Sequence, residues 1–322
     1  MTFFKPCMLA VLLAASPLTV HAAYPDQPIR LVVPHPAGGS SDILARTMAA
    51  AMSKDLGQSI VVENKGGGNG AIAAQTVANA KPDGYTLLLA TASTHGINPT
   101  LYRKLNYDAI KDFAPVTLFA TVPNVLVVGA AHKQMNSLKD LLQFMKDNPG
   151  KTNMGSAGSG TPGHLAGVML KDAEHLDLVH VPFKGGAPVI SALIGGQIDF
   201  MFTTIPGAIS HIKAGSIKGL AVSSAERSDA LPELPTVAEA GVPGFEAVSW
   251  HGLVAPAKTP QPVIDALYQA ASKALNSEDV KSKLANEGAR AAKMTPDEFG
   301  AFIQAQINAW GAAVKSSGAR AD

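Results

Sequence analysis

Three glycine-rich segments carry the clearest chemical signal in this sequence, at residues 36–40, 66–71 and 155–161. Each follows a strand-like run and precedes a helix-like run. Such a loop can present unpaired backbone N–H groups, and the positive end of the following helix dipole attracts negative charge. Any one loop could be a tight turn alone. Together they predict an anion site, because ligands bind beyond the carboxyl ends of the strands in open α/β sheets.

Two of these segments match the dinucleotide fingerprint loosely. Residues 66–71 fit G-x-G-x-x-A, and residues 158–163 fit G-x-G-x-x-G, with Asp177 near the spacing of a ribose-binding acid. We reject a dinucleotide site for two reasons. Thr161 and Pro162 form a cap pair that starts the helix inside the second match. An NAD-binding site is also not expected in an exported protein without cysteine.

Patterns that indicate catalysis are missing from the sequence. No serine lies in a G-x-S-x-G turn, since Met154 stands two residues before Ser156 and Ala157 two residues before Ser159. H-E-x-x-H and the P-loop lysine motif are absent too. Without a nucleophile, a base and an oxyanion site, we expect no enzyme activity, no metal and no cofactor.

Four histidines stand near the expected loop ends and are candidate ligand contacts: His35, His95, His164 and His251. The alternative is a structural, hydrogen-bonded role, which is the commoner one for a lone histidine.

The first 23 residues are typical of a secretory signal. Lys5 precedes an apolar stretch at residues 8–20, and small residues at 22 and 23 allow cleavage. The alternative, a membrane anchor, is disfavoured because the stretch is short and contains a proline. We therefore expect a periplasmic protein. Its only cysteine, Cys7, leaves with the signal, which excludes disulfides and thiolate chemistry from the mature chain.

Composition narrows the class of protein further. The chain has 322 residues, of which 47% are hydrophobic and 16% charged, so it can bury a full core. A formal net charge of +1 gives no argument for nucleic acid or an anionic membrane surface. No second apolar run approaches membrane-spanning length, so we expect no membrane insertion of the mature chain.

Strand-like and helix-like runs alternate along the sequence. Residues 29–33, 60–62 and 85–90 are expected strands, separated by expected helices, and this order predicts a parallel sheet covered by helices. The first expected helix is at residues 40–56, where Ser40 or Ser41 can cap its start and Gly57 ends it. Further expected strands are at 122–128, 152–156, 178–183, 198–202 and 217–222. The end is expected to be helical, at 262–275, at 277–286, and after a capping box at 295–298. About 300 mature residues indicate two lobes.

The chain resembles the Bug proteins, the solute receptors of tripartite tricarboxylate transporters. The residues that carry the resemblance are 24–34, 36–39 with Asp42, 62–64, 81–87, 98–99 with 101–102, 156–158, 164–167, 179–185, 195–199, 234–241 and 255–256. They extend over essentially the whole mature chain. Each segment alone is weak evidence for the family, whereas all of them together are specific to it.

This resemblance implies an α/β fold of the periplasmic binding protein type II class, with two lobes, a ligand cleft and a hinge crossed twice. Lobe 1 is expected at residues 24–121 and 247–322, and lobe 2 at 122–246. The implied partners are a small di-, tri- or aromatic carboxylate and the integral membrane subunits of a tripartite transporter. We expect a monomer. Alternatives are a ligand-dependent partner of a two-component sensor and, less favoured, a periplasmic enzyme.

The resemblance also implies which residues contact the ligand. One wall is Ala37, Gly38, Gly39 and Ser40, and a second segment is Ser93, Thr94 and His95. The opposing wall is Ser156, Gly158, Thr161 and His164, flanked by Lys184 and Gly185, with Asp199 and Thr203 at the far end.

This sequence departs from the family pattern at two places. His35 stands where an aromatic residue such as Phe is expected, either as plain pocket wall or as a polar contact. At 202–206, many relatives carry Asp-Asn before the proline, and this chain carries Thr203 and Thr204. The missing acid predicts a preference for plain di- or aromatic carboxylates over amino acids.

Overall fold

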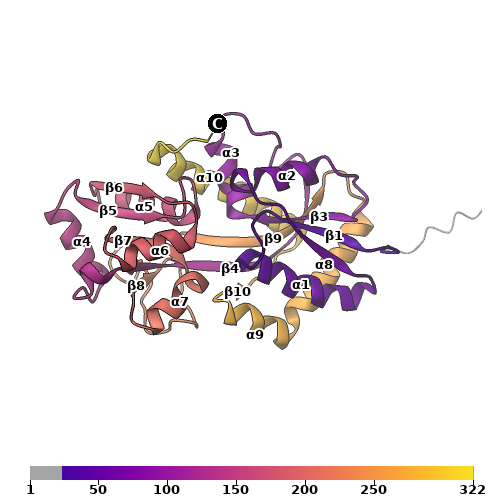
Figure 1. Ribbon diagram of the computed structural model, residues 1–322. Helices are drawn as coiled ribbons and strands as arrows, with labels where there is room; N and C mark the ends of the chain where they lie inside the picture. The colour runs from indigo at the N-terminus through magenta and orange to yellow at the C-terminus, as the bar shows by residue number, and fades with distance from the viewer. Residues whose placement is uncertain (1–23, 322) are drawn as a thin grey trace, which may run out of the picture.

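The computed structural model describes residues 24–321, so the predicted signal segment at residues 1–23 lies outside the described part. Two groups of helices and strands lie side by side and are joined by two long strands, β4 and β9 (Figure 1). We call the group on the right of Figure 1 lobe 1 and the group on the left lobe 2.

The sheet of lobe 1 has the order β2-β1-β3-β9-β4, with the first three strands parallel and β9 antiparallel to its neighbours. In β1, Leu31 and Val33 pack toward α1 and α8, whereas Val32 packs toward α2 and α10. Both faces are therefore buried, as the unbroken apolar run predicts. The strands are β1(Ile29–Val33), β2(Ile60–Asn64), β3(Thr86–Thr91), β4(Phe113–Val128) and β9(Val248–Pro256).

The sheet of lobe 2 has the order β6-β5-β7-β4, with β8 also paired to β4. Strands β5, β6 and β7 are parallel, so their carboxyl ends lie at one edge. Phe200 and Phe202 of β7 pack toward α4 and α5, and Met201 packs toward α6 and α7. The strands are β5(Thr152–Ser156), β6(Leu178–Pro182), β7(Phe200–Thr204) and β8(Lys218–Val222).

Strand β4 belongs to both sheets. Its residues 113–123 pair with β9 in lobe 1, and its residues 124–128 pair with β7 and β8 in lobe 2. The second connection runs alongside it, since the Asn124 amide donates to the carbonyl of Ala247, which directly precedes β9, at 2.9 Å. The chain thus passes between the lobes at two adjacent places.

Helices cover both faces of each sheet. In lobe 1 they are α1(Ser40–Leu56), α8(Gln261–Asn276) and α9(Glu278–Asn286) on one face, and α2(Ala71–Ala78), α3(Asn98–Leu101) and α10(Pro296–Ser317) on the other. In lobe 2 they are α4(Leu138–Asp147), α5(Pro162–Ala173), α6(Gly186–Ile194) and α7(Ile205–Lys213). Within residues 24–321, none of the helices combines the length and apolar character needed to cross a membrane.

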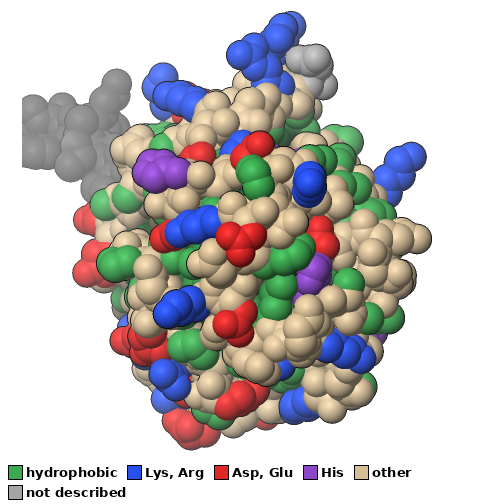
Figure 2. Space-filling view, turned by 90° about the vertical axis from the view of Figure 1, so that its left-hand side faces the viewer, with side chains coloured by type: hydrophobic (Ala, Val, Ile, Leu, Met, Phe, Trp, Pro, Cys, Tyr) green, Lys and Arg blue, Asp and Glu red, His purple; other side chains and the backbone are tan. Residues whose placement is uncertain are grey.

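Two predicted helix starts are confirmed by their hydrogen bonds. Ser137 caps α4, and Thr295 with Glu298 forms a capping box at α10, where each side chain bonds the other's backbone N–H. The surface is mixed in charge: on the end of lobe 2 shown in Figure 2, basic and acidic side chains are interspersed. A single-sign patch for a polyanion is not seen on that face.

Candidate ligand-binding site

The loops that follow β1, β2 and β3 meet at one edge of lobe 1. Gly70 lies between Pro34 and Thr94, and a β-carbon added to it would stand 2.6 Å from the Thr94 methyl carbon. Its φ of +85° is also one that glycine adopts without strain. This close approach brings the predicted glycine segments at 36–40 and 66–71 together.

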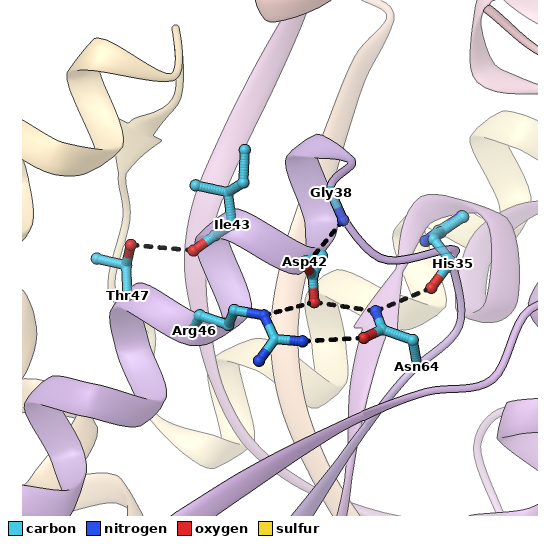
Figure 3. Close-up of polar contacts among 7 residues, drawn as sticks. All are labelled: His35, Gly38, Asp42, Ile43, Arg46, Thr47 and Asn64. Atoms are coloured by element: carbon cyan, nitrogen blue, oxygen red, sulfur yellow. Dashed lines mark hydrogen bonds and ion pairs between the residues drawn. The ribbon is translucent and has the colours of Figure 1, made fainter.

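Asp42 fixes the loop before α1 (Figure 3). Its carboxylate accepts hydrogen bonds from the Gly38 N–H at 2.9 Å and the Asn64 amide at 3.0 Å, and it pairs with Arg46 at 3.0 Å. The same Asn64 amide donates to the His35 carbonyl at 3.1 Å. Burial opposes ionisation of Asp42, but the bonds from Arg46, Gly38 and Asn64 outweigh it and hold its pKa below the ordinary value. The loop therefore has a defined shape.

The first turn of α1 is not capped by a side chain. We expected Ser40 or Ser41 to cap it, but the N-cap is Gly39, and no side chain bonds the first N–H groups. The hydroxyl of Ser41 instead bonds the Nε2 atom of His251 on β9 at 2.8 Å. That expectation was wrong, and the result is a helix N-terminus whose N–H groups are open to an anion.

Lobe 2 presents a matching edge at the ends of β5 and β6. The hydroxyl of Ser156 donates to the Gly158 carbonyl at 3.0 Å and lies 2.7 Å from His180 Nε2. Thr161 is the N-cap of α5 as predicted, but its hydroxyl also donates to Gly158, at 2.7 Å, and does not cap the helix. The Gly185 N–H bonds the Ala157 carbonyl at 3.1 Å, which joins this loop to the start of α6.

Two stacked histidine rings lie under the start of α5. The rings of His164 and His180 are 3.8 Å apart, and His164 Nδ1 accepts the Gly160 N–H at 3.1 Å. Burial, and then the neighbouring His180, lower the pKa of His164 to about 4, and burial also lowers the pKa of His180. Both rings are therefore neutral near pH 7, and this wall attracts an anion through its backbone dipoles.

The loop edges of the two lobes touch. The Asn69 amide donates to the Gly160 carbonyl at 3.4 Å and to the Asn98 side chain at 3.0 Å. Gly160 has a φ of +75°, and a β-carbon on it would stand 2.5 Å from the Leu101 side chain, so glycine favours the close approach of the two lobes here. The open starts of α1 and α5 thus lie on opposite sides of one boundary.

The structure brings most of the predicted site residues to these two edges. Those on the lobe 1 edge are His35, Ala37, Gly38, Gly39, Ser40, Ser93 and Thr94, and those on the lobe 2 edge are Ser156, Gly158, Thr161, His164, Lys184, Gly185 and Thr203. Lys184 is exposed, whereas Ser93 and Thr94 are buried.

Two predicted contacts lie elsewhere. Asp199 precedes β7 and bonds His132 Nε2 and the Asn153 N–H, both at 2.6 Å, at the opposite end of the strand from Thr203. His95 is fully buried, and its ring packs edge-on against Phe113 at 4.7 Å. Burial lowers the pKa of His95 to about 3. The proposed ligand site therefore includes neither Asp199 nor His95.

Sequence reasoning missed three residues that shape these edges: Ser41, Asn69 and Asn64. Their partners are far away in the chain, as with Ser41 and His251, which are 210 positions apart. The local signals are Asn64, a polar residue at the end of a strand, and Asn69, which lies in the predicted glycine segment at 66–71.

The fold and the loops define the class of protein. Periplasmic binding protein BugD has the same fold, with 36% sequence identity and a TM-score of 0.80 over 92% of this chain and 99% of BugD. The model of the tripartite tricarboxylate transporter family receptor matches residues 44–319. The chain belongs to this family, and the predicted resemblance to Bug proteins and the predicted fold class are confirmed.

Two structures of relatives contain a ligand. Rpa4515 of R. palustris, with adipate, is 36% identical, with a TM-score of 0.83 over 92% of this chain and 98% of that protein. MatC (Rpa3494) from Rhodopseudomonas palustris, with bound malate, is 34% identical, with a TM-score of 0.79 over 90% of this chain and 100% of that protein. Both ligands carry two carboxylates.

Proposed function

We propose that this chain is a periplasmic receptor that binds a small carboxylate between its lobes and delivers it to the membrane subunits of a tripartite transporter. One observation carries the proposal: two helix N-termini without side-chain caps, those of α1 and α5, lie on facing loop edges. Each attracts an anionic oxygen. The relatives with adipate and malate support a ligand with an acid group at each end.

The proposed contacts are the loop edges described above. Backbone N–H groups and hydroxyls near Ser40 form one wall, and those near Ser156 and Thr161 form the other. N–H and O–H groups bind carboxylate oxygens through charge-assisted hydrogen bonds, and these strengthen when closure removes water. No positively charged counter-ion is required by this scheme, although Lys184 stands close to the lobe 2 edge.

We propose that the membrane subunits of the transporter recognise the receptor when its lobes are closed. The two connections at Pro123 and Ala247 lie side by side, and they allow one lobe to rotate against the other about a short hinge. We assign residues 24–121 and 247–322 to lobe 1 and residues 122–246 to lobe 2. The proposed hinge lies at these boundaries.

The test is a thermal-shift panel with purified residues 24–322, stripped of ligand by unfolding and refolding. Mono-, di- and tricarboxylates, aromatic acids and amino acids are each added in a concentration series. A ligand at a hundred times its Kd stabilises the folded state by about 2.7 kcal/mol. That raises the Tm by roughly 5–10 °C at about 2–4 °C per kcal/mol. We expect diacids to raise the Tm most, and aspartate and glutamate to raise it less than succinate does. A panel without any dose-dependent shift would contradict carboxylate capture.

A further inference from the structure

Three buried polar atoms at the start of α1 make no hydrogen bond within the described residues. They are Nδ1 of His35, Oγ of Ser40 and Nδ1 of His251. His251 is only 5% exposed, and it lies close enough to His35 for the two rings to influence each other's charge. A buried polar atom without a partner costs about 1–3 kcal/mol. Three such atoms at one place indicate a site that a ligand completes.

The position of His251 in the sheet places it at the ligand edge. It pairs in register with Thr91, the last residue of β3, so it lies beside the carboxyl end of that strand. His35 stands just beyond the end of β1, in the loop that leads to α1. His35 precedes the first turn of α1, Ser40 begins it and His251 bonds Ser41 within it, so the three atoms lie near the N-terminus of a 17-residue helix.

The contact with Ser41 determines which nitrogen of the His251 ring is available to a ligand and whether it carries a proton. The Ser41 hydroxyl lies 2.8 Å from Nε2 of His251, which leaves only Nδ1 for a further bond. Burial, with His35 nearby, lowers the pKa of His251 to about 3, so the ring is neutral near pH 7. If Ser41 donates its proton to Nε2, the ring proton is on Nδ1 and that atom is a donor. An acid oxygen at the helix N-terminus is the partner that fits a donor there.

We propose that His251, oriented by Ser41, is a specificity-determining residue whose Nδ1–H donates to an oxygen of the ligand's second acid group. His35 and Ser40 supply further donors at the same place. This inference rests on the proposed function and deepens it, because it assigns one end of a diacid to lobe 1. The other end then belongs to the loops of Ser156 and Thr161. Unlike a lysine or arginine, this wall recognises the acid without carrying charge.

The test compares a diacid with the monoacid of equal chain length, such as adipate with hexanoate or succinate with butyrate, by calorimetry. The wild-type protein is expected to prefer the diacid. His251→Phe keeps a ring of similar shape and removes both nitrogens. We expect it to weaken diacid binding at least tenfold and monoacid binding less than twofold. His251→Asn retains a side-chain donor and is expected to recover part of the preference. The matched control is His211→Phe, near the end of α7 and away from both loop edges.

A second measurement separates recognition from a merely structural role. Imidazole ¹⁵N chemical shifts report which nitrogen carries the proton, and we expect Nδ1 of His251 to carry it in the diacid complex. Ser41→Ala is expected to lose that tautomer preference and to weaken diacid binding severalfold. A diacid preference that survives H251F, or an Nδ1 without its proton in the complex, would overturn the inference alone. A wild-type protein that binds no acid in the panel would overturn the proposed function as well.

Discussion

The side-chain amide of Asn69 donates to the carbonyl oxygen of Gly160 at 3.4 Å, and this bond joins lobe 1 to lobe 2 at the loop edges. Asn69 has a φ of +51°, a conformation that asparagine and glycine tolerate better than other residues. The bond exists only while the two edges are close. It therefore contributes to the closed arrangement and not to the folding of either lobe alone.

Replacing Asn69 with glycine is expected to speed ligand release. The substitution keeps the backbone conformation and removes two bonds: the one between the lobes, which is worth about 0.5–1.5 kcal/mol, and the one to the Asn98 side chain within lobe 1. We expect the dissociation rate to rise about 2–10-fold, and the loss of the bond to buried Asn98 to lower the Tm of the ligand-free protein modestly. The chain's two tryptophans, Trp250 and Trp310, share the Gln306 oxygen near the hinge strands, so stopped-flow fluorescence can follow opening. Asn79→Gly, at an exposed helix end, is the control, and equal rates in both variants would contradict the prediction.

Asp42 is expected to stabilise the ligand loop more than its partner Arg46 does. Asp42→Ala leaves the Gly38 N–H and the Asn64 amide without their acceptor, at a cost of about 1–3 kcal/mol. Because the loop then loses its shape, ligand affinity should fall as well. Arg46 is about half exposed, so R46A should cost less than about 1 kcal/mol. Urea unfolding and calorimetry of the two variants provide the comparison. An equal loss of stability in both would show that the ion pair, and not the loop bonds, is what matters.

Buried histidines are expected to make the ligand-free protein acid-sensitive. Burial lowers the pKa of His35 to about 4 and that of His95 and His251 to about 3, against about 6.5 in the unfolded chain. Below about pH 6.5 these histidines bind protons in the unfolded chain but not in the folded chain. The free energy of unfolding therefore falls as the pH drops toward 4. Each group contributes up to about 1.4 kcal/mol per pH unit.

The measurement is urea unfolding between pH 7.5 and 4.5. His95→Phe should reduce the number of protons taken up on unfolding by about one, since phenylalanine cannot titrate and keeps an aromatic ring beside Phe113. Exposed His175→Asn serves as the matched control. A slope that is the same in H95F and the wild type would mean that His95 is protonated alike in the folded and unfolded chains.

Much of the fold could be predicted from apolar patterning and caps. The predicted helix at residues 40–56 and its end at Gly57, which has a φ of +68°, are confirmed. Strand β9 was missed, because its run of Ser249, Trp250, His251 and Gly252 lacks the β-branched residues that indicate a strand. Its strand character comes from its place between β3 and β4, which supply backbone partners on both sides.

The sequence predicted the position of the site only where a glycine-rich segment marks a loop. The glycine segments mark their own positions in the sequence. Asp199, just before β7, and Thr203, near its end, are four residues apart along extended backbone, which is roughly 13 Å at about 3.3 Å per residue. They therefore cannot both lie at the ligand edge, and the sequence does not say which one does. The wrong cap for α1 has a similar cause, since the Ser41 hydroxyl is taken by a histidine 210 positions away. Contacts between distant segments decide both cases.

Gly163 is expected to control how closely the start of α5 approaches β7. A β-carbon at this position would stand 2.4 Å from the Phe202 carbonyl oxygen, which is backbone and cannot rotate away. Gly163→Ala should therefore displace the first turn of α5 and its N-cap Thr161, at a cost of about 1–3 kcal/mol. Ligand affinity should fall with it, because the displaced turn is part of the proposed lobe 2 wall.

Gly186→Ala is the matched control, since its added β-carbon meets nothing within 4 Å. At the first position of α6 this substitution should be neutral or stabilise the protein by up to about 1 kcal/mol, because alanine favours helix. Urea unfolding and adipate calorimetry on both variants give the test. Loss of affinity in G163A with unchanged stability would still place the α5 turn at the ligand. Wild-type stability and affinity in G163A would contradict the close packing of α5 on β7 as the feature that positions this wall.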